Sequence, residues 1–157
     1  MIMLIVIAIA AAAGIWFWFF YLDHRTPQQV MDAEDGTDPM KRWARVAYVG
    51  VNGKFDPARF GQQACRDTLK RDWDIADAAR LQAQDQELAQ APSGNVAWDH
   101  IRRLLLGRLG VGAAFVDEGY FTRVATSAKQ ALTSTYSSWD NMLADYREGL
   151  VAWSNGD

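Results

Sequence analysis

The stretch SSWDNMLADYREGLVAWSNG, residues 137–156, decides the fold class because its apolar residues recur at the period of an α-helix. On a helical wheel they form one stripe, made up of Trp139, Met142, Leu143, Tyr146, Leu150 and Trp153. Ser137 is expected to cap this helix, with Asp140 as the acid of a capping box, and Asn155-Gly156 to end it. A stripe of this kind normally packs against a core, so we expect it to face the protein interior.

Upstream segments have the same helical period, and no run alternates like a convincing strand. Proline next to a capping aspartate, as at Asp38-Pro39 and Asp56-Pro57, marks two of the helix starts. Asp117 is expected to cap a third. The sequence therefore predicts an all-α domain of about six helices over residues 39–157. The five helices before the last are expected at Met40 to Val51, Pro57 to about Arg71, Asp77 to Gln90, Asn95 to about Leu109, and Glu118 to about Thr135.

The N-terminus is an apolar segment of a different kind. None of the 35 charged residues lies in the first 22 positions. Residues 2–22 form a run of 21 residues, and a helix of that length spans a hydrocarbon core of roughly 30 Å. The alternative is a cleaved signal peptide, but no Lys or Arg precedes the run, and cleavage after Ala13 leaves the aromatic stretch 15–21 exposed. We therefore predict a single-pass transmembrane anchor at residues 1–22.

The region after the anchor bears on topology. Residues 23–38 contain five acidic residues and few large apolar ones, so we expect an acidic spacer or a frayed extension of the membrane helix that adds little to a packed core. Arg25, followed by Lys41 and Arg42, gives a small excess of positive charge on this side. By the positive-inside rule this favours a cytoplasmic domain at a bacterial inner membrane, with a periplasmic domain left open.

Composition excludes several classes of function. A net charge of -3 and a pI near 5.3 lack the basic footprint of a nucleic-acid binder. A single cysteine, Cys65, excludes an intramolecular disulfide framework and a cysteine-rich zinc site, and two histidines make a histidine metal centre improbable on composition. No nucleophile elbow or phosphate loop is present. We expect no metal, no cofactor and no nucleic-acid partner.

Several motifs, taken in order, resemble the domain of unknown function 1266 family of bacterial proteins over about residues 42–156. The residues that carry the resemblance are Trp43, Trp73-Asp74-Ile75, Ala97-Trp98-Asp99 followed by Arg102, Arg108 with Gly110 and Gly112, Asp117-Glu118, Ser138-Trp139, and Tyr146, Gly149 and Trp153 in the pattern YxxGxxxW. The segment 112–116 departs from the family pattern, and the membrane helix is not part of the family domain. The resemblance implies a compact helical domain and supplies no established reaction, cofactor or ligand.

One polar cluster is a candidate for either structure or ligand binding. Asp99 and Arg102 lie three residues apart, where helical side chains can pair. A structural ion pair that joins this helix to the last one is favoured over a charged pair in a cleft. The full cluster is Asp99, Arg102, Tyr146, Ser138, Trp98 and Trp139. His100, next to Asp99 in sequence, is expected at the surface because adjacent helical positions do not face each other.

These observations favour a non-enzymatic, membrane-anchored module that binds a protein partner, one concrete version being an immunity-type protein that neutralises a toxin. Charged residues opposite the apolar stripes of the last two helices are the predicted contact surface, namely Arg123, Lys129, Asp145, Arg147 and Glu148. The alternative is an enzyme or small-molecule binder that uses Asp99 and Arg102. The oligomeric state is left open.

Overall fold

The computed structural model describes residues 27–52 and 56–155. Within these ranges every regular element is a helix, so the predicted all-α class is confirmed for the described part of the chain. The α-helices are α2 (Pro27–Asp35), α3 (Pro39–Asn52), α4 (Gln62–Trp73), α5 (Ala78–Leu88), α6 (Val96–Gly112), α7 (Glu118–Thr135) and α8 (Trp139–Ser154), and a short 3-10 helix η1 (Pro57–Phe60) precedes α4.

Each of the six expected helices has a counterpart, and one of them is divided. The segment expected as a single helix from Pro57 to Arg71 breaks at Gly61, whose φ of 89° lies in the region that favours glycine. The predicted caps Asp38, Asp56 and Asp117 accept backbone hydrogen bonds at the starts of α3, η1 and α7. The start of α8 is one residue later than predicted, because Ser138 rather than Ser137 is its cap.

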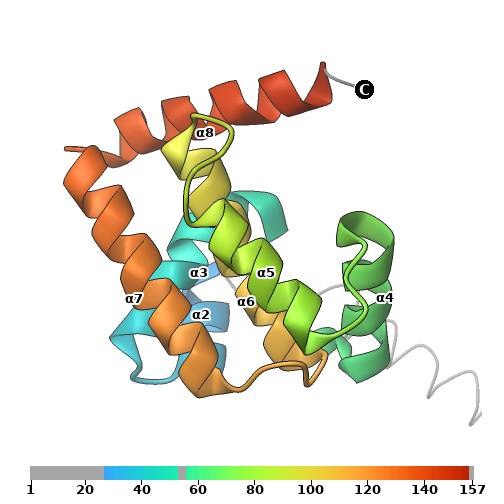
Figure 1. The fold of residues 1–157 in the computed structure, drawn as a ribbon. Coiled ribbons are helices and arrows are strands. Elements are labelled where there is room, and N and C mark those ends of the chain that lie inside the picture. The colour runs from blue at the N-terminus through green and yellow to red at the C-terminus, as the bar shows by residue number, and fades with distance from the viewer. Residues whose placement is uncertain (1–26, 53–55, 156–157) are drawn as a thin grey trace, which may run out of the picture.

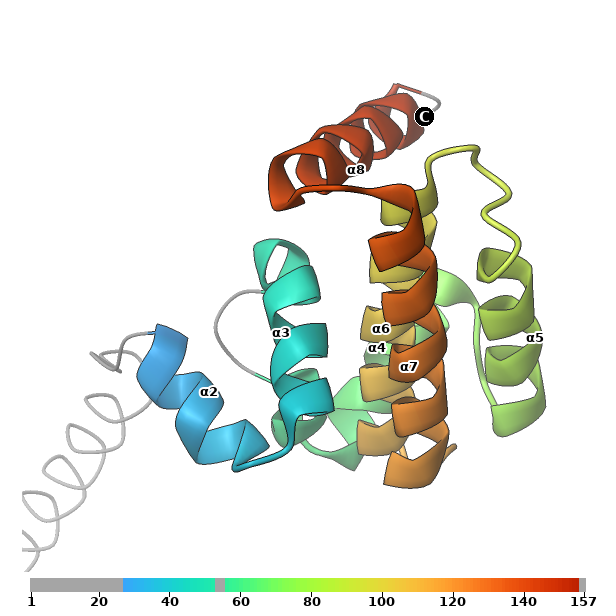
Figure 2. The same ribbon diagram turned by 90° about the vertical axis from the view of Figure 1, so that its left-hand side faces the viewer.

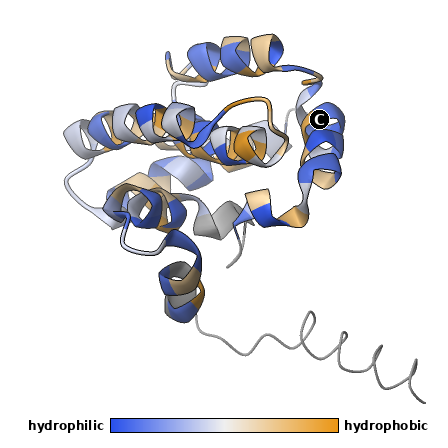
Figure 3. Ribbon diagram, turned by 90° about the horizontal axis from the view of Figure 1, so that it is seen from below, coloured by the Kyte–Doolittle hydropathy of each residue, from blue (hydrophilic) through white to orange (hydrophobic). Residues whose placement is uncertain are grey.

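Helix α6 forms the centre of the molecule. It packs against η1 and against five helices, α3, α4, α5, α7 and α8, which surround it (Figures 1 and 2). Figure 3 shows hydrophilic and hydrophobic residues interspersed along the outer helices, as expected for amphipathic helices around a core. Because α6 is covered on most sides, residues around its whole circumference are buried.

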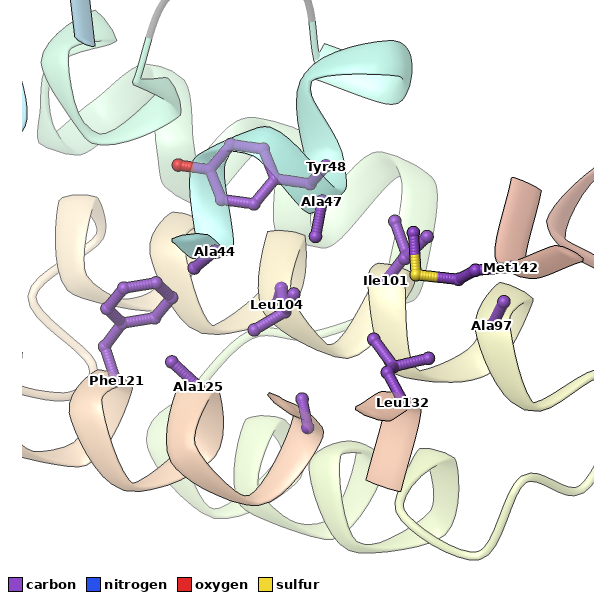
Figure 4. Packing of buried hydrophobic residues seen from close by; sticks show 11 residues of the cluster. Ala44, Ala47, Tyr48, Ala97, Ile101, Leu104, Phe121, Ala125, Leu132 and Met142 are labelled. Atoms are coloured by element: carbon purple, nitrogen blue, oxygen red, sulfur yellow. The ribbon is translucent and has the colours of Figure 1, made fainter. Parts of the chain in front are cut away.

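Two hydrophobic clusters flank α6. On one side, Ile101 and Leu104 pack with residues of α3, α7 and α8 that include Phe121 and Leu132 (Figure 4). On the other side, Leu106 and Leu109 pack with the apolar residues of α4 and α5. The domain is thus held by one central helix with a cluster on each flank.

The acidic stretch before α3 is folded where the structure describes it. Residues 27–35 form α2, which packs against α3 (Figure 2). Val30 is fully buried, and the buried carboxylate of Asp35 accepts hydrogen bonds from the Arg45 guanidinium at 2.7 and 2.8 Å. The expectation that residues 23–38 add little to a packed core is therefore wrong for this helix, because ion pairing lets a polar segment be buried.

The predicted transmembrane anchor at residues 1–22 lies outside the described residues. Among the helices that the structure does describe, none has the length and apolar character needed to cross a membrane.

Candidate binding surface

Helix α8 exposes most of the apolar stripe that was expected inside. The exposed fractions are 45% for Trp139, 39% for Leu143, 39% for Leu150 and 55% for Trp153. Met142 and Gly149 are instead the buried residues of this helix. The expectation that the whole stripe packs against the core is therefore wrong, since α8 is rotated so that one edge of the stripe faces inward and the rest faces outward.

A close approach between α8 and α6 explains part of this rotation. A Cβ atom added to Gly149 would lie 2.5 Å from Trp98 Cγ, which is too close for any other residue without a shift of the helices. Glycine at this position lets the α8 backbone rest on the Trp98 indole. The Trp98 ring also packs against Tyr146 and Trp153, with ring centroids 5.3 and 6.1 Å apart.

A carboxylate on the inward edge of α8 explains the remaining part of the rotation of this helix. Asp145 accepts hydrogen bonds from the backbone N–H of Ala97 at 2.7 Å, the Asn95 side-chain amide at 3.1 Å and the Tyr136 hydroxyl at 2.6 Å. The Asn95 side chain makes no cap hydrogen bond at the start of α6, so Asp145 supplies the missing acceptor from another helix. Burial and the bond to Asp145 raise the pKa of Tyr136 to about 12. Asp145, predicted to contact a partner, therefore faces the protein's own core.

The outward side of α8 is the main apolar surface of the described helices. We call it the α8 outer face and define it as Trp139, Leu143, Leu150 and Trp153, with the half-buried Tyr146 at its centre. At 100° per residue, Asp140 and Arg147 lie along the solvent edge of this face. Both side chains are exposed, and neither is paired with a charged group of the described chain.

A hollow adjoins the N-terminal end of the α8 outer face. Its volume is about 280 Å³, and it opens between α3, the end of α7 and the start of α8. Trp139 belongs both to this hollow and to the outer face. The lining residues are Trp43, Leu132, Thr133, Tyr136, Ser137, Ser138, Trp139 and Met142.

The other predicted partner residues are distributed over two helices. Arg123 is exposed on α7, with its guanidinium 5.7 Å from the Tyr120 ring centroid. Lys129 is half-buried, and its ammonium lies 5.7 Å from the Trp43 ring centroid. Arg147 and Glu148 are exposed on α8 as predicted. Thus three of the five predicted residues are exposed, and only Arg147 borders the α8 outer face.

The predicted polar cluster is not assembled as one site. Asp99 is 1% exposed and accepts hydrogen bonds from the backbone N–H and hydroxyl of Ser93 at 2.9 and 2.7 Å, so it secures the loop before α6. Its nearest approach to Arg102 is 3.9 Å, a long ion pair. Tyr146 and Trp98 are near this group, whereas Ser138 and Trp139 line the hollow at the other end of α8.

Arg102 is held mainly by aromatic rings. Its guanidinium carbon lies 4.8 Å from the Trp73 ring centroid and 4.9 Å from that of Trp98. Burial lowers the pKa of Arg102 from its ordinary value, and cation–π contact compensates for part of the lost hydration. The side chain thus joins α6 to the end of α4, an arrangement that occupies it structurally.

Buried charged groups form a second feature, which the periodicity arguments missed. Asp56 accepts hydrogen bonds from Arg108, which also pairs with Glu118 at 2.9 Å. Arg45, fully buried, contacts Asp35 and approaches Asp56 at 3.6 Å. These ion pairs connect α2, α3, η1, α6 and α7. The one sequence signal for them is the presence of arginines among the apolar positions of α3 and α6.

His100 is also inside the protein. It is 4% exposed, which makes the expected surface position wrong, and its Nδ1 atom has no hydrogen-bond partner. Burial, together with the charge of Arg103, lowers the pKa of His100 from its ordinary value. Within the described residues, no group of three or more histidines, cysteines or acids is arranged to hold a metal ion.

Comparison with known protein families gives a match that covers the C-terminal helices. Residues 86–157 match a family described as protein of unknown function (DUF1266). Over these residues the chain is similar to the DUF1266 family. The predicted resemblance is confirmed there, whereas its portion over residues 42–85 lies outside the match. No curated protein and no solved structure matches the chain. The DUF1266 region contains α6, α7 and α8, and with them the whole α8 outer face; Trp43, in the wall of the hollow, comes from α3.

Proposed function

We propose that the chain is a membrane-anchored helical module that binds a protein partner through the α8 outer face. The observation that carries the proposal is the exposure of two tryptophans and two leucines along one side of a single helix. Scattered apolar residues are normal on protein surfaces, but a continuous apolar patch with a polar rim is typical of an interaction site. Tryptophan is also enriched among the residues that contribute most to binding energy.

The size of this face corresponds to a modest contact area. A large aromatic side chain buries about 150–250 Å², so the exposed portions of Trp139 and Trp153 with the two leucines leave on the order of 300 Å² of apolar surface. At about 25 cal/mol per Å², covering this area contributes roughly 7 kcal/mol before the entropic costs of association. A helix or groove with an apolar stripe is the complementary partner chemistry.

The uncharged segment at residues 2–22 supports the membrane part of the proposal. Anchoring confines the domain to a thin layer and raises its effective concentration towards a partner in the same membrane. The positive charges after the segment support a cytoplasmic domain at a bacterial inner membrane. An immunity-type protein that neutralises a toxin is one form of this function. Retention in the membrane pellet after carbonate washing is expected, and release of the full-length chain would contradict the anchor.

The alternative, a small-molecule or enzymatic site at Asp99 and Arg102, has weaker support. Asp99 is engaged by Ser93, and Arg102 is enclosed by two tryptophans. A reacting group needs access to substrate, and both side chains already serve packing.

A photo-crosslinking experiment tests the protein-binding proposal. Benzoylphenylalanine is placed at Leu143, on the α8 outer face, and separately at Gln130, an exposed position of α7, as the matched control. After irradiation of cells that express the full chain, Leu143 is expected to give a discrete protein adduct and Gln130 none. Absence of a protein adduct at Leu143 in a folded, membrane-bound chain, or adducts with lipid only, would contradict the proposal.

A further inference from the structure

We propose that the partner of the α8 outer face is a second copy of this chain, with the two α8 helices packed antiparallel about a two-fold axis. This inference rests on the proposed function, because it names the partner of the same surface. Three features of α8 support it: the spacing of its exposed apolar residues, the sizes of those residues, and the charges beside them.

The spacing is that of a coiled-coil seam. Trp139, Leu143, Tyr146, Leu150 and Trp153 follow one another at intervals of four, three, four and three residues. This is the a/d pattern of a heptad repeat, with leucine at both a positions and an aromatic residue at each d position. A seam of this kind predicts a helix as its partner, packed along the length of α8. Helix α8 lies at the edge of the domain (Figure 1), and Trp139, Leu143, Leu150 and Trp153 of the seam are exposed there, where a second helix has access to them.

The side-chain sizes favour an antiparallel pair of identical helices. Antiparallel packing sets a positions against d positions, so Leu143 meets the partner's Tyr146 and Leu150 meets the partner's Trp139. Each of these layers combines one leucine with one aromatic ring, so large and small groups interdigitate, and Trp153 lies beyond the paired layers at the end of the seam. A parallel pair would set tryptophan against tryptophan in the same layer. A two-fold axis repeats every layer, which gives the self-complementary interface of a cyclic dimer.

The charges beside the seam agree with this register. Asp140 and Arg147 both occupy e positions, on the edge of the seam away from the domain. In the antiparallel register just described, Asp140 lies beside the partner's Arg147, and the symmetry creates the same ion pair a second time. Exposed ion pairs add little affinity, but like charges at these sites oppose association, so the pair selects the register and the partner. Glu148 occupies the neighbouring f position, away from the contact.

The small area of the seam indicates a dimer that depends on both copies being held in the same membrane. About 300 Å² of apolar surface from each copy is less than the roughly 800 Å² that each partner buries in a stable interface of standard size. Anchoring both copies in the same membrane would compensate for the small contact area, because it confines them to one layer and one approximate orientation. We therefore expect association of the full-length chain in membranes and weaker association after dilution in detergent.

The test uses full-length copies with two different tags, co-expressed, extracted in mild detergent and captured through one tag. Co-capture of the second tag is expected for the wild-type pair. When both copies carry Arg147→Asp, or both carry Asp140→Arg, like charges meet twice and we expect about a ten-fold loss of co-capture. A pair in which one copy carries Arg147→Asp and the other Asp140→Arg restores opposite charges at both sites, and we expect recovery. Glu148→Arg is the matched control, with little change expected.

Each outcome decides the inference. Melting temperatures of the single variants check that they fold, and Leu143→Asp is expected to abolish co-capture by placing charges in the seam. Failure of wild-type copies to co-capture, or failure of the mixed pair to recover, overturns the second-copy proposal. If wild-type copies remain apart while a crosslinker at Leu143 captures a different protein, the proposed function stands and only this inference fails. If no protein adduct forms at Leu143, both fail.

Discussion

Asp145 fixes the orientation of α8 on the domain, so replacing it tests why the α8 outer face is exposed. Asp145→Ala removes the acceptor for the Ala97 N–H, the Asn95 amide and the Tyr136 hydroxyl. A hydrogen bond to a charged group contributes about 1.5–3 kcal/mol, and a negative charge at a helix N-terminus adds about 0.3–1 kcal/mol. The site is half-buried, and the Ala97 N–H retains a bond to the Tyr136 oxygen at 3.1 Å. A net loss of about 3 kcal/mol follows.

The assay is chemical and thermal unfolding of the full-length chain in detergent, followed by circular dichroism. For a domain of this size, about 3 kcal/mol corresponds to a fall in melting temperature of roughly 10 °C. Glu148→Ala, three residues along the same helix on its exposed side, is the control and should change stability by less than about 0.5 kcal/mol. A double-mutant cycle with Tyr136→Phe should give a coupling free energy of about 1 kcal/mol. Equal stabilities for Asp145→Ala and Glu148→Ala would refute the capping role.

Three further predictions concern packing, buried charge and pH. Gly149→Ala should lower the free energy of unfolding by about 1–3 kcal/mol, because the added methyl group overpacks against the Trp98 indole of α6. Gly119→Ala is the control: its methyl group meets only ordinary contacts, so it should be neutral or stabilising by up to about 1 kcal/mol. Equal effects of the two variants in urea titrations would contradict the α6–α8 contact. Arg45→Met should cost about 3–5 kcal/mol by the same measurement because it leaves buried carboxylates without a cation, and a cost below about 1 kcal/mol would show that the ion pairs are not needed. The pKa of His100 is lowered in the folded state, so below about pH 6.5 the unfolded state binds more protons than the folded state. The free energy of unfolding should therefore fall as the pH drops from about 6.5 towards the pKa of His100 in the folded protein. His100→Gln should remove this component, and parallel stability profiles for wild type and variant between pH 7 and 5 would contradict it.

Periodicity and capping were sufficient to predict the helices from α3 onward, whereas α2 was not predicted. Amphipathic spacing gave the six expected segments, and aspartates before helix starts marked α3, η1 and α7, because both signals act within one or two turns of the chain. The break at Gly61 was missed, since a single positive φ leaves the surrounding helical pattern intact.

The orientation of α8 depended on contacts between helices and was mispredicted. Its apolar stripe is clear in sequence, but the side that packs is chosen by Gly149 against Trp98 and by Asp145 at the start of α6. Both are pairings between residues about 50 positions apart, which a helical wheel does not contain. The glycine in YxxGxxxW is the available local signal, since glycine within a helix suggests close approach of another element.

The buried polar groups were missed for a related reason. Polar composition suggested that the stretch before α3 was a spacer, yet Asp35 is buried because Arg45 neutralises it. His100 was expected at the surface because it is adjacent to Asp99 in the helix, and adjacent positions do not face each other. Both side chains are in fact buried in the central helix. Composition predicts the burial of polar residues poorly when each depends on a partner from a distant segment.

Thiol labelling of α8 distinguishes an outward-facing apolar stripe from a buried one. Leu143→Cys and Met142→Cys are neighbours on the helix, one predicted to face outward and the other buried, and the native Cys65 is 1% exposed and serves as an internal reference. In the dilute full-length protein, Leu143→Cys should react with a maleimide at nearly the rate of a free thiol, and Met142→Cys at least about ten times more slowly. Protection of Leu143→Cys equal to that of Met142→Cys at all dilutions would mean that the apolar stripe packs inside the domain, and the α8 outer face would not exist.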